Sequence, residues 1–154
     1  MNARLDYRSA APKAMAAMAE LERQVRSTDL GKPLLELVRA RASQINGCAY
    51  CLDMHTKDAR AEGETEQRLY MLSVWRETSI FTERERSALA WTEAITRIAD
   101  GAISDAVYQD ALRYFGEKAL VDLTLAVIAI NGWNRLAIAF QMKPGTYQPK
   151  ALEP

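Results

Sequence analysis

Residues 47–55 read Gly-Cys-Ala-Tyr-Cys-Leu-Asp-Met-His, and they contain both cysteines and the only histidine of this 154-residue chain. Asn46-Gly47 is a turn dipeptide, so a helix is expected to begin at about Cys48. On that helix, Cys48, Cys51 and His55 follow the i, i+3, i+7 spacing that places side chains on one face. The stretch therefore predicts a helix that starts with two thiols and carries an imidazole on the same side.

The rest of the chain has the same helical character. Apolar residues recur at helical spacing almost everywhere, and no stretch alternates as a strand does. We predict an all-α fold, a single-domain bundle of about six to seven helices over residues 1–143, followed by a C-terminal tail over residues 144–154. The expected helices run from about Ser9, through Pro12, to Val25; from Lys32 to Asn46; from Cys48 to Glu62; from Thr65 past Trp75; from Thr82 to about Ala99; from Ser104 past Leu112; and from Glu117 to Gln141.

Charge and hydropathy exclude several classes of function. The 20 basic and 20 acidic residues are interspersed and give zero net charge, which argues against nucleic-acid binding and against attraction to an anionic membrane. The first twenty residues carry charges that a signal peptide lacks, and the longest uncharged apolar run, Leu123–Ile130, is too short to span a bilayer. We therefore expect a cytoplasmic protein without a membrane segment.

The last expected helix bears on assembly. Its apolar positions include Leu120, Val121, Leu125 and Ile128, and they leave almost no polar side. Such a helix is either central to the core or buried against another subunit. We therefore expect a homo-oligomer.

Two cysteines at the start of a helix suit thiol redox chemistry. The helix N-terminus favours the thiolate and lowers a cysteine pKa from its free value of about 8.5. A thiolate that attacks a peroxide becomes a sulfenic acid, and a neighbouring thiol can convert this acid to a disulfide. Cys48 and Cys51 supply both sulfurs, and the flexible turn before Cys48 allows the short distance that a disulfide needs. The pair therefore predicts reduction of a hydroperoxide, with electrons returned by a thiol or dithiol donor.

A carboxylate is expected beside the imidazole. Glu36 lies about ten residues before the turn and His55 about nine after it, so two antiparallel helices would bring them nearly level. A carboxylate that binds one imidazole nitrogen fixes the tautomer of the ring, which a proton relay to a cysteine requires. We therefore predict that Glu36 orients His55.

These residues also carry a resemblance to a known family. Glu36, Cys48-x-x-Cys51 and x-x-x-His55 resemble the signature of alkylhydroperoxidase-D-like (AhpD-like) proteins in the carboxymuconolactone decarboxylase superfamily, and the likeness extends over about residues 34–140. The resemblance implies an all-α fold, assembly as a homo-oligomer, often a trimer or hexamer, and peroxide reduction. It also implies that Cys51 forms the sulfenic acid and that Cys48 donates a proton and resolves it. Glu36 and His55 would relay protons.

Two neighbouring residues are secondary candidates for the site. Well-known members of the family carry histidine immediately before the second cysteine, where this chain has Tyr50, so the details of the relay and the choice of partner stay open. Tyr50 can line the site or simply pack. Asp53 can also line it, although a carboxylate in the first turn of a helix stabilises the helix dipole in any case.

The same residues fit other functions less well. A structural zinc site usually needs four ligands, and Cys48, Cys51 and His55 are the only cysteines and histidine of the chain. A lyase of the carboxymuconolactone decarboxylase type has no evident use for a redox-active pair. A redox sensor or interaction module would form the same disulfide without turning over a substrate. We therefore expect an enzyme, a peroxidase with peroxiredoxin-type activity that needs neither a metal nor an organic cofactor.

Overall fold

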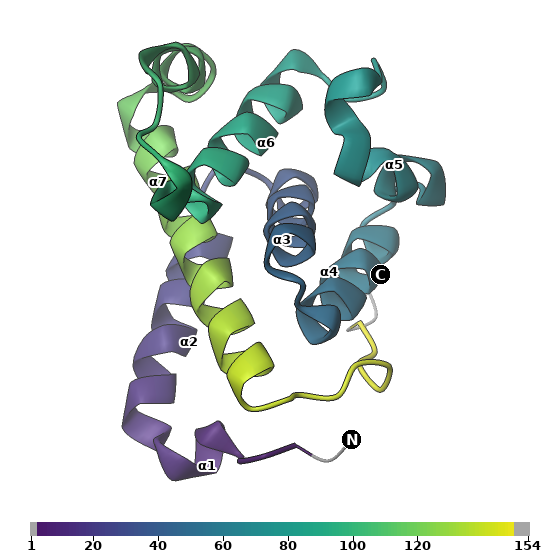
Figure 1. The fold of residues 1–154 in the computed structure, drawn as a ribbon, viewed down its shortest axis with the longest axis vertical. Helices are drawn as coiled ribbons and strands as arrows, with labels where there is room; N and C mark the ends of the chain where they lie inside the picture. The colour runs from purple at the N-terminus through teal and green to yellow at the C-terminus, as the bar shows by residue number, and fades with distance from the viewer. Residues whose placement is uncertain (1–2, 150–154) are drawn as a thin grey trace.

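The computed structural model describes residues 3–149, and within that range every regular element is a helix (Figure 1). This confirms the predicted all-α fold class. Residues 1–2 and 150–154, the latter being the end of the predicted tail, lie outside the described residues. The described elements are α1 (Tyr7–Ala10), α2 (Pro12–Arg26), α3 (Lys32–Asn46), α4 (Ala49–Ala61), α5 (Glu66–Met71), the 3-10 helix η1 (Leu72–Glu77), α6 (Glu83–Thr96), the 3-10 helix η2 (Ile98–Asp100) and α7 (Asp105–Ala139).

The N-terminal part differs from the prediction of one helix over residues 9–25. The chain instead forms α1 and α2, which are separated at Ala11, where φ is −136° and ψ is 62°. Pro12 explains the break, because the residue before a proline is disfavoured in the helical region. Asp6 starts α1 separately, since its side chain accepts hydrogen bonds from two backbone N–H groups of that helix. The prediction of a single helix was therefore wrong here.

The N-terminal segment packs on the end of α7. The backbone N–H of Arg4 donates to the carbonyl of Phe140 at 2.9 Å. The rings of Tyr7 and Phe140 lie 5.6 Å apart between their centroids. These contacts place α1 beside the first turn of α4, where the cysteines lie, because Tyr7 and Cys51 border the same cavity.

The turn between α3 and α4 positions the cysteines. Gly47 ends α3 with a φ of 68° and a ψ of 29°, a left-handed conformation that glycine adopts without strain. The backbone N–H of Cys48 then donates to the carbonyl of Ser43 at 3.0 Å, and Cys48 is the N-cap of α4. This confirms the predicted helix that begins at the cysteine pair. The two helices pack against each other, as Figure 1 shows.

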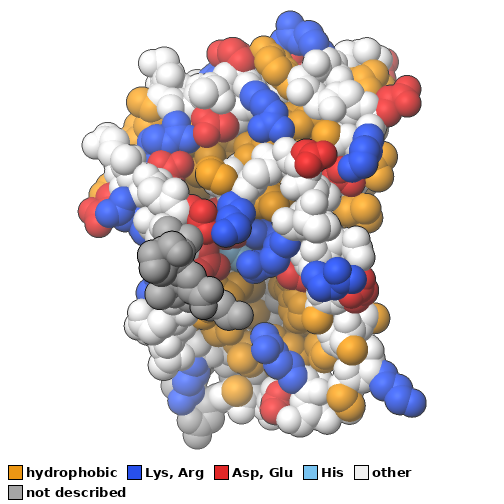
Figure 2. Space-filling model, turned by 180° about the vertical axis from the view of Figure 1, so that it is seen from behind, with side chains coloured by type: hydrophobic (Ala, Val, Ile, Leu, Met, Phe, Trp, Pro, Cys, Tyr) orange, Lys and Arg blue, Asp and Glu red, His pale blue; other side chains and the backbone are white. Residues whose placement is uncertain are grey.

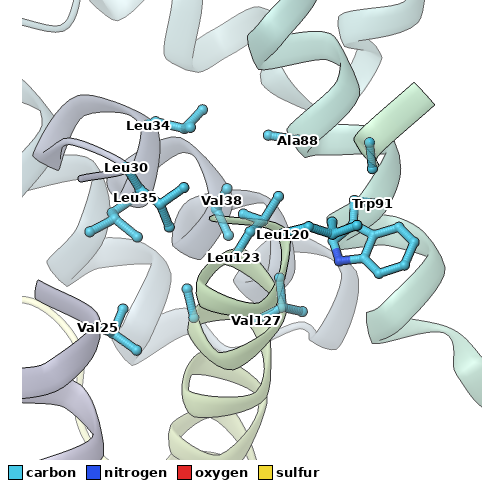
Figure 3. Packing of buried hydrophobic residues seen from close by; sticks show 12 residues of the cluster. Val25, Leu30, Leu34, Leu35, Val38, Ala88, Trp91, Leu120, Leu123 and Val127 are labelled. Atoms are coloured by element: carbon cyan, nitrogen blue, oxygen red, sulfur yellow. The ribbon is translucent and has the colours of Figure 1, made fainter. Parts of the chain in front are cut away.

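Helix α3 lies in the middle of the bundle, in contact with α4, α6 and α7. Figure 3 shows Val38 of α3, Leu123 of α7 and Trp91 of α6 among the side chains that meet in the largest core cluster. The indole N–H of Trp91 also donates to the hydroxyl of Thr124 at 3.0 Å, which ties α6 to α7. The core therefore fixes α3, the helix that carries Glu36.

Helix α7 spans 35 residues and is interrupted at Gly116, where φ is 67° and ψ is 175°. The interruption separates two helical parts, as the sequence predicted. The side chain of Ser104 caps the first part by accepting the backbone N–H of Val107, and the second part starts at Glu117, the predicted position.

The second part of α7 is apolar on two sides. Within residues 3–149, α7 is the one helix long and apolar enough to cross a membrane by length and composition alone, and 39% of its most apolar 18-residue window is buried in the protein. Leu123 and Val127 face the core. Val121, Leu125 and Ile128 are exposed at 59%, 37% and 49%. The helix thus combines a core face with an uncovered apolar face.

After α7 the chain returns to α4. The backbone N–H of Gly145 donates to the Asp53 carboxylate at 2.9 Å, and the Lys57 ammonium donates to the carbonyl of Tyr147 at 3.1 Å. The hydroxyl of Tyr147 donates to Asp58 at 2.6 Å. These hydrogen bonds hold the segment against the outer side of α4.

Candidate active site

The two thiols lie at the first turn of α4, where both are buried and free. The backbone N–H of Cys51 donates to the sulfur of Cys48 at 3.4 Å. A hydrogen bond from the Cys51 thiol, helped by backbone N–H groups, lowers the pKa of Cys48 to about 7. The same thiol hydrogen bond and burial raise the pKa of Cys51. Of the two thiols, Cys48 therefore ionises first, and Cys51 keeps its proton.

A buried amide from α7 completes the thiol site. Asn134 is 0% exposed, and its side chain hydrogen-bonds to both thiols, which favours their ionised forms. Its carbonyl oxygen accepts from the Asn46 amide at 2.8 Å, and its own amide donates to the hydroxyl of Ser43 at 3.1 Å. Sequence reasoning missed Asn134 as a site residue. A polar residue inside an apolar helix is the signal that could have found it, because buried amides need partners.

His55 and Glu36 face each other between α4 and α3. His55 Nδ1 donates to Glu36 Oε2 at 2.7 Å, and both residues are buried. This confirms the prediction that Glu36 lies level with His55. Burial raises the pKa of Glu36, but hydrogen bonds from His55 and Arg39 outweigh burial and hold this pKa below its ordinary range. Glu36 therefore stays ionised and fixes the ring, which leaves Nε2 of His55 as the nitrogen available for proton exchange.

Arg39 holds the other oxygen of the Glu36 carboxylate. Its Nη1 donates to Glu36 Oε1 at 2.5 Å, and its Nη2 donates to Glu22 Oε1 at 2.6 Å. Arg39 is only 2% exposed, and a buried charge persists only when it is paired. Sequence reasoning missed Arg39 and Glu22. The signal was an arginine three residues after Glu36 on a helix whose neighbouring positions are apolar.

One cavity of about 170 Å³ joins Cys51 to His55. Among residues 3–149, no direct hydrogen bond links His55 to either cysteine, so any proton that passed between them would have to cross the cavity through a water or a bound molecule. Figure 2 shows a face of the molecule on which basic and acidic side chains cluster next to hydrophobic ones, and the cavity lining has the same mixture. The remaining lining includes Tyr7 and Arg8 of α1, Tyr50 and Met54 of α4, and Trp133 of α7.

The two secondary candidates take different places. Tyr50 lines the cavity, and burial raises the pKa of its hydroxyl, so this group stays protonated at neutral pH. Asp53 faces the C-terminal segment, where it binds Lys57 and the backbone N–H of Gly145. The structure therefore brings Tyr50, but not Asp53, to the cavity of Cys51.

Glu36, His55 and Asp58 form a group that could hold a metal ion, since one ligand atom of each lies within 4.8 Å of the others. These atoms already have protein partners. Glu36 binds His55 and Arg39, and Asp58 accepts a hydrogen bond from Tyr147. Neither cysteine belongs to the group. The arrangement suits proton transfer through fixed hydrogen bonds.

The chain is thus an all-α bundle with a Cys-x-x-Cys pair at a helix start and a buried Glu–His pair beside it, and its fold is AhpD-like. The chain belongs to the carboxymuconolactone decarboxylase family, whose model matches residues 12–94. The matched range contains Glu36, both cysteines and His55. The resemblance seen in the sequence is therefore confirmed.

Individual relatives agree with this family. YdfG of Bacillus subtilis (strain 168), an uncharacterized protein, is 40% identical over 139 residues, which cover 90% of this chain and 95% of YdfG. A crystal structure from Agrobacterium tumefaciens, of a protein of unknown function suggested to be the antioxidant defence protein AhpD, has a TM-score of 0.91 and 39% identity, and the match covers 95% of this chain and 100% of that one. A peroxidase-related AhpD-core protein from Ralstonia eutropha JMP134 has a TM-score of 0.79 at 17% identity, over 90% of this chain and 74% of that one, which shows the shared fold alone.

Proposed function

We propose that this protein is a thiol-dependent peroxidase that reduces hydroperoxides through a Cys51 sulfenic acid and a Cys48–Cys51 disulfide. One observation carries the proposal: Cys51 and His55 line the same cavity, and Glu36 holds His55 in place at 2.7 Å. A peroxide in that cavity would meet a sulfur nucleophile and a proton-transfer group together. The AhpD suggestion for the Agrobacterium relative supports the same class of reaction.

The first step uses the proton that the two thiols share. Cys48, whose pKa is lowered to about 7, acts as the general base and accepts the proton of Cys51 as the Cys51 sulfur attacks, because the raised pKa of Cys51 disfavours its free thiolate. The Cys51 sulfur bonds to one peroxide oxygen, the O–O bond breaks, and Cys51 becomes a sulfenic acid. The alkoxide takes the proton from Cys48, directly or through His55, and leaves as an alcohol. Cys48 is again a thiolate, and the peroxide has been reduced by two electrons.

The second step forms the disulfide. The Cys48 thiolate attacks the sulfur of the Cys51 sulfenic acid, and hydroxide leaves as water with a proton that His55 relays from solvent. A thiol or dithiol donor then returns two electrons and regenerates both thiols. All the groups that these steps require come from this chain and its two reactants, so no metal or organic cofactor enters the proposal.

We also propose that the protein acts in the cytoplasm as a homo-oligomer, a trimer or a hexamer. The uncovered face of α7 supports the assembly, because Val121, Leu125 and Ile128 follow helical spacing and together expose a continuous apolar stripe. A second subunit would remove this stripe from water.

Hydroperoxide consumption with a dithiol reductant tests the proposal in the wild type and in Cys51→Ser, Cys48→Ser and His55→Ala. We expect Cys51→Ser to abolish turnover and His55→Ala to slow it. Cys48→Ser removes both the base of the first step and the resolving thiol, so turnover should be much slower, and in the absence of dithiol a dimedone-type reagent should trap the sulfenic acid that forms on Cys51. Equal rates in all four proteins would remove the enzyme hypothesis and leave the sensor function.

A further inference from the structure

We propose that the reducing dithiol enters through a second opening, a groove over Cys48, and not through the cavity that admits the peroxide. The groove runs between the start of α4 and the end of α7, and it encloses about 350 Å³. This inference rests on the proposed function, since it concerns the reduction of the Cys48–Cys51 disulfide. It assigns the groove to a ligand with two neighbouring thiols.

The two openings lie on different sides of the cysteine pair. The cavity of about 170 Å³ is lined by Cys51 and not by Cys48, whereas the groove is lined by Cys48 and not by Cys51. Tyr50 and Ala137 border both, so these two residues form the wall between them. Each cysteine therefore borders its own opening.

The sizes of the two openings fit two different reactants. The cavity is smaller than the roughly 300–1,000 Å³ of a typical small-molecule site, so it suits the reacting end of a hydroperoxide. The groove is about twice as large as the cavity. The groove therefore leaves room for a dithiol, whose two thiols and linking carbons must reach Cys48 together.

The groove has the surface that a thiolate donor needs. Cys48 is buried but lines the groove between Gly47 and Ala49, which are both exposed. Ile138 and Met142 give an apolar wall for a carbon skeleton, and Ile138 is 46% exposed. The described lining contains no carboxylate, so an approaching thiolate meets no like charge there.

The exchange reaction has a direction that matches this geometry. A thiolate attacks a disulfide sulfur from the side opposite the bond that breaks, so a donor in the groove attacks Cys48 and displaces Cys51. A mixed disulfide forms between the donor and Cys48, and the S–S bond to Cys51 breaks. The donor's second thiolate then attacks its own sulfur in the mixed disulfide, which frees Cys48 as a thiolate. Two electrons pass from the dithiol to the cysteine pair.

The leaving sulfur needs help that the site supplies. In the reduced pair the hydrogen bond to Cys48 and burial raise the pKa of Cys51. Burial persists when Cys48 is in the mixed disulfide, so Cys51 leaves more readily when it takes a proton. Cys51 opens toward the cavity of His55, where Nε2 can pass a proton to it through water. Attack on Cys48 therefore places the leaving group on the side where proton transfer is available.

Chemical labelling tests the two routes without any peroxide turnover. Cys51→Ser keeps Cys48 alone, and Cys48→Ser keeps Cys51 alone. Each variant is alkylated with iodoacetamide and with a bulky fluorescein iodoacetamide, and the ratio of the two rate constants removes the difference in intrinsic thiol reactivity. We expect the bulky-to-small ratio to be about tenfold higher for Cys48 than for Cys51. An equal ratio, or a higher ratio at Cys51, would overturn the proposal.

Steady-state kinetics of variants that narrow one opening or the other provide a second test. Ala49→Trp narrows the groove, and Met54→Trp narrows the cavity. We expect Ala49→Trp to raise the KM for dithiothreitol about tenfold and to leave the KM for peroxide unchanged. We expect Met54→Trp to raise the KM for peroxide and to leave the KM for dithiothreitol unchanged. Reduced thioredoxin serves as a protein dithiol in the same assay of Ala49→Trp. If the KM rises more for dithiothreitol, the groove binds a small dithiol, and if it rises more for thioredoxin, the groove binds a protein dithiol. If the wild type is active and Ala49→Trp leaves the KM for both donors unchanged, the groove proposal is wrong but the proposed function stands. An inactive wild type contradicts the proposed function itself.

Discussion

His55 and Glu36 are 19 residues apart in the sequence, and their Nδ1 and Oε2 atoms are 2.7 Å apart in the fold. The carboxylate is bound on both sides, since Arg39 donates to its other oxygen. The imidazole therefore cannot turn without breaking a buried, charge-assisted hydrogen bond. A proton relay needs such a fixed ring.

Glu36→Gln should slow peroxide reduction while leaving the bundle folded. The amide keeps an acceptor for His55 but removes the charge that makes this hydrogen bond strong, so we expect kcat/KM to fall about tenfold to a hundredfold. Steady-state peroxide consumption measures the effect. Glu62→Gln, which changes a glutamate paired with Lys32 outside the site, is the matched control and should keep the wild-type rate.

Arg39→Met should destabilise the folded state. The substitution leaves one oxygen of a buried carboxylate without its cation, which costs about 3 kcal/mol of the free energy of unfolding. Urea unfolding followed by circular dichroism measures this loss. Arg23→Met, which removes an exposed ion pair with Glu20, should leave the unfolding midpoint unchanged. A midpoint for Arg39→Met that matches this control would contradict the role given to the buried pair.

The alkylation of Cys48 should depend on pH with a midpoint at about pH 7, because hydrogen bonds from Cys51 and the backbone lower its pKa to about 7. Only the thiolate reacts, so the rate falls as the pH drops below this midpoint and reaches a plateau above it. Mass spectrometry of the iodoacetamide adduct measures the profile. Cys51→Ala removes the largest of these hydrogen bonds and should move the midpoint up toward the pKa of a free thiol. An unmoved midpoint would show that Cys51 does not set it.

Ile128→Lys should weaken the proposed oligomer. Ile128 is 49% exposed on the uncovered face of α7, so a charge there is tolerated in a monomer and disfavoured in an apolar interface. Sedimentation velocity measures the state of assembly. Ile98→Lys changes another exposed apolar residue, 61% exposed but away from α7, and should keep the wild-type assembly. Identical sedimentation of the two variants would exclude this face as the interface.

The sequence was sufficient for the parts of the site that follow from helix geometry. Cys48, Cys51 and His55 share one helix, and Glu36 lies on the helix joined to it by a short turn, so spacing alone placed them together. Asn134 comes from a helix far along the chain, and nothing in local spacing shows which residue of α7 meets the thiols. Its position depends on how the whole core packs.

Charge pairing was a second feature that the sequence alone could not predict. Arg39 is an ordinary charged residue in the sequence, and its burial arises because Glu22 of α2 and Glu36 of α3 both reach it. The break at Ala11 was readable in principle, since a proline follows it, but Pro12 also fits the first turn of a helix. The sequence allowed both alternatives, and the cap formed by Asp6 favours the break.

The docking of the chain's beginning on the end of α7 has a practical meaning for anyone who prepares this protein. None of the three described core clusters includes a residue of α1, yet Tyr7 and Arg8 wall the chamber in which Cys51 lies. A version trimmed to start at Pro12 would keep its scaffold and lose a side of that chamber. In the proposed peroxidase, the loss of α1 would therefore widen the way to Cys51 for larger molecules.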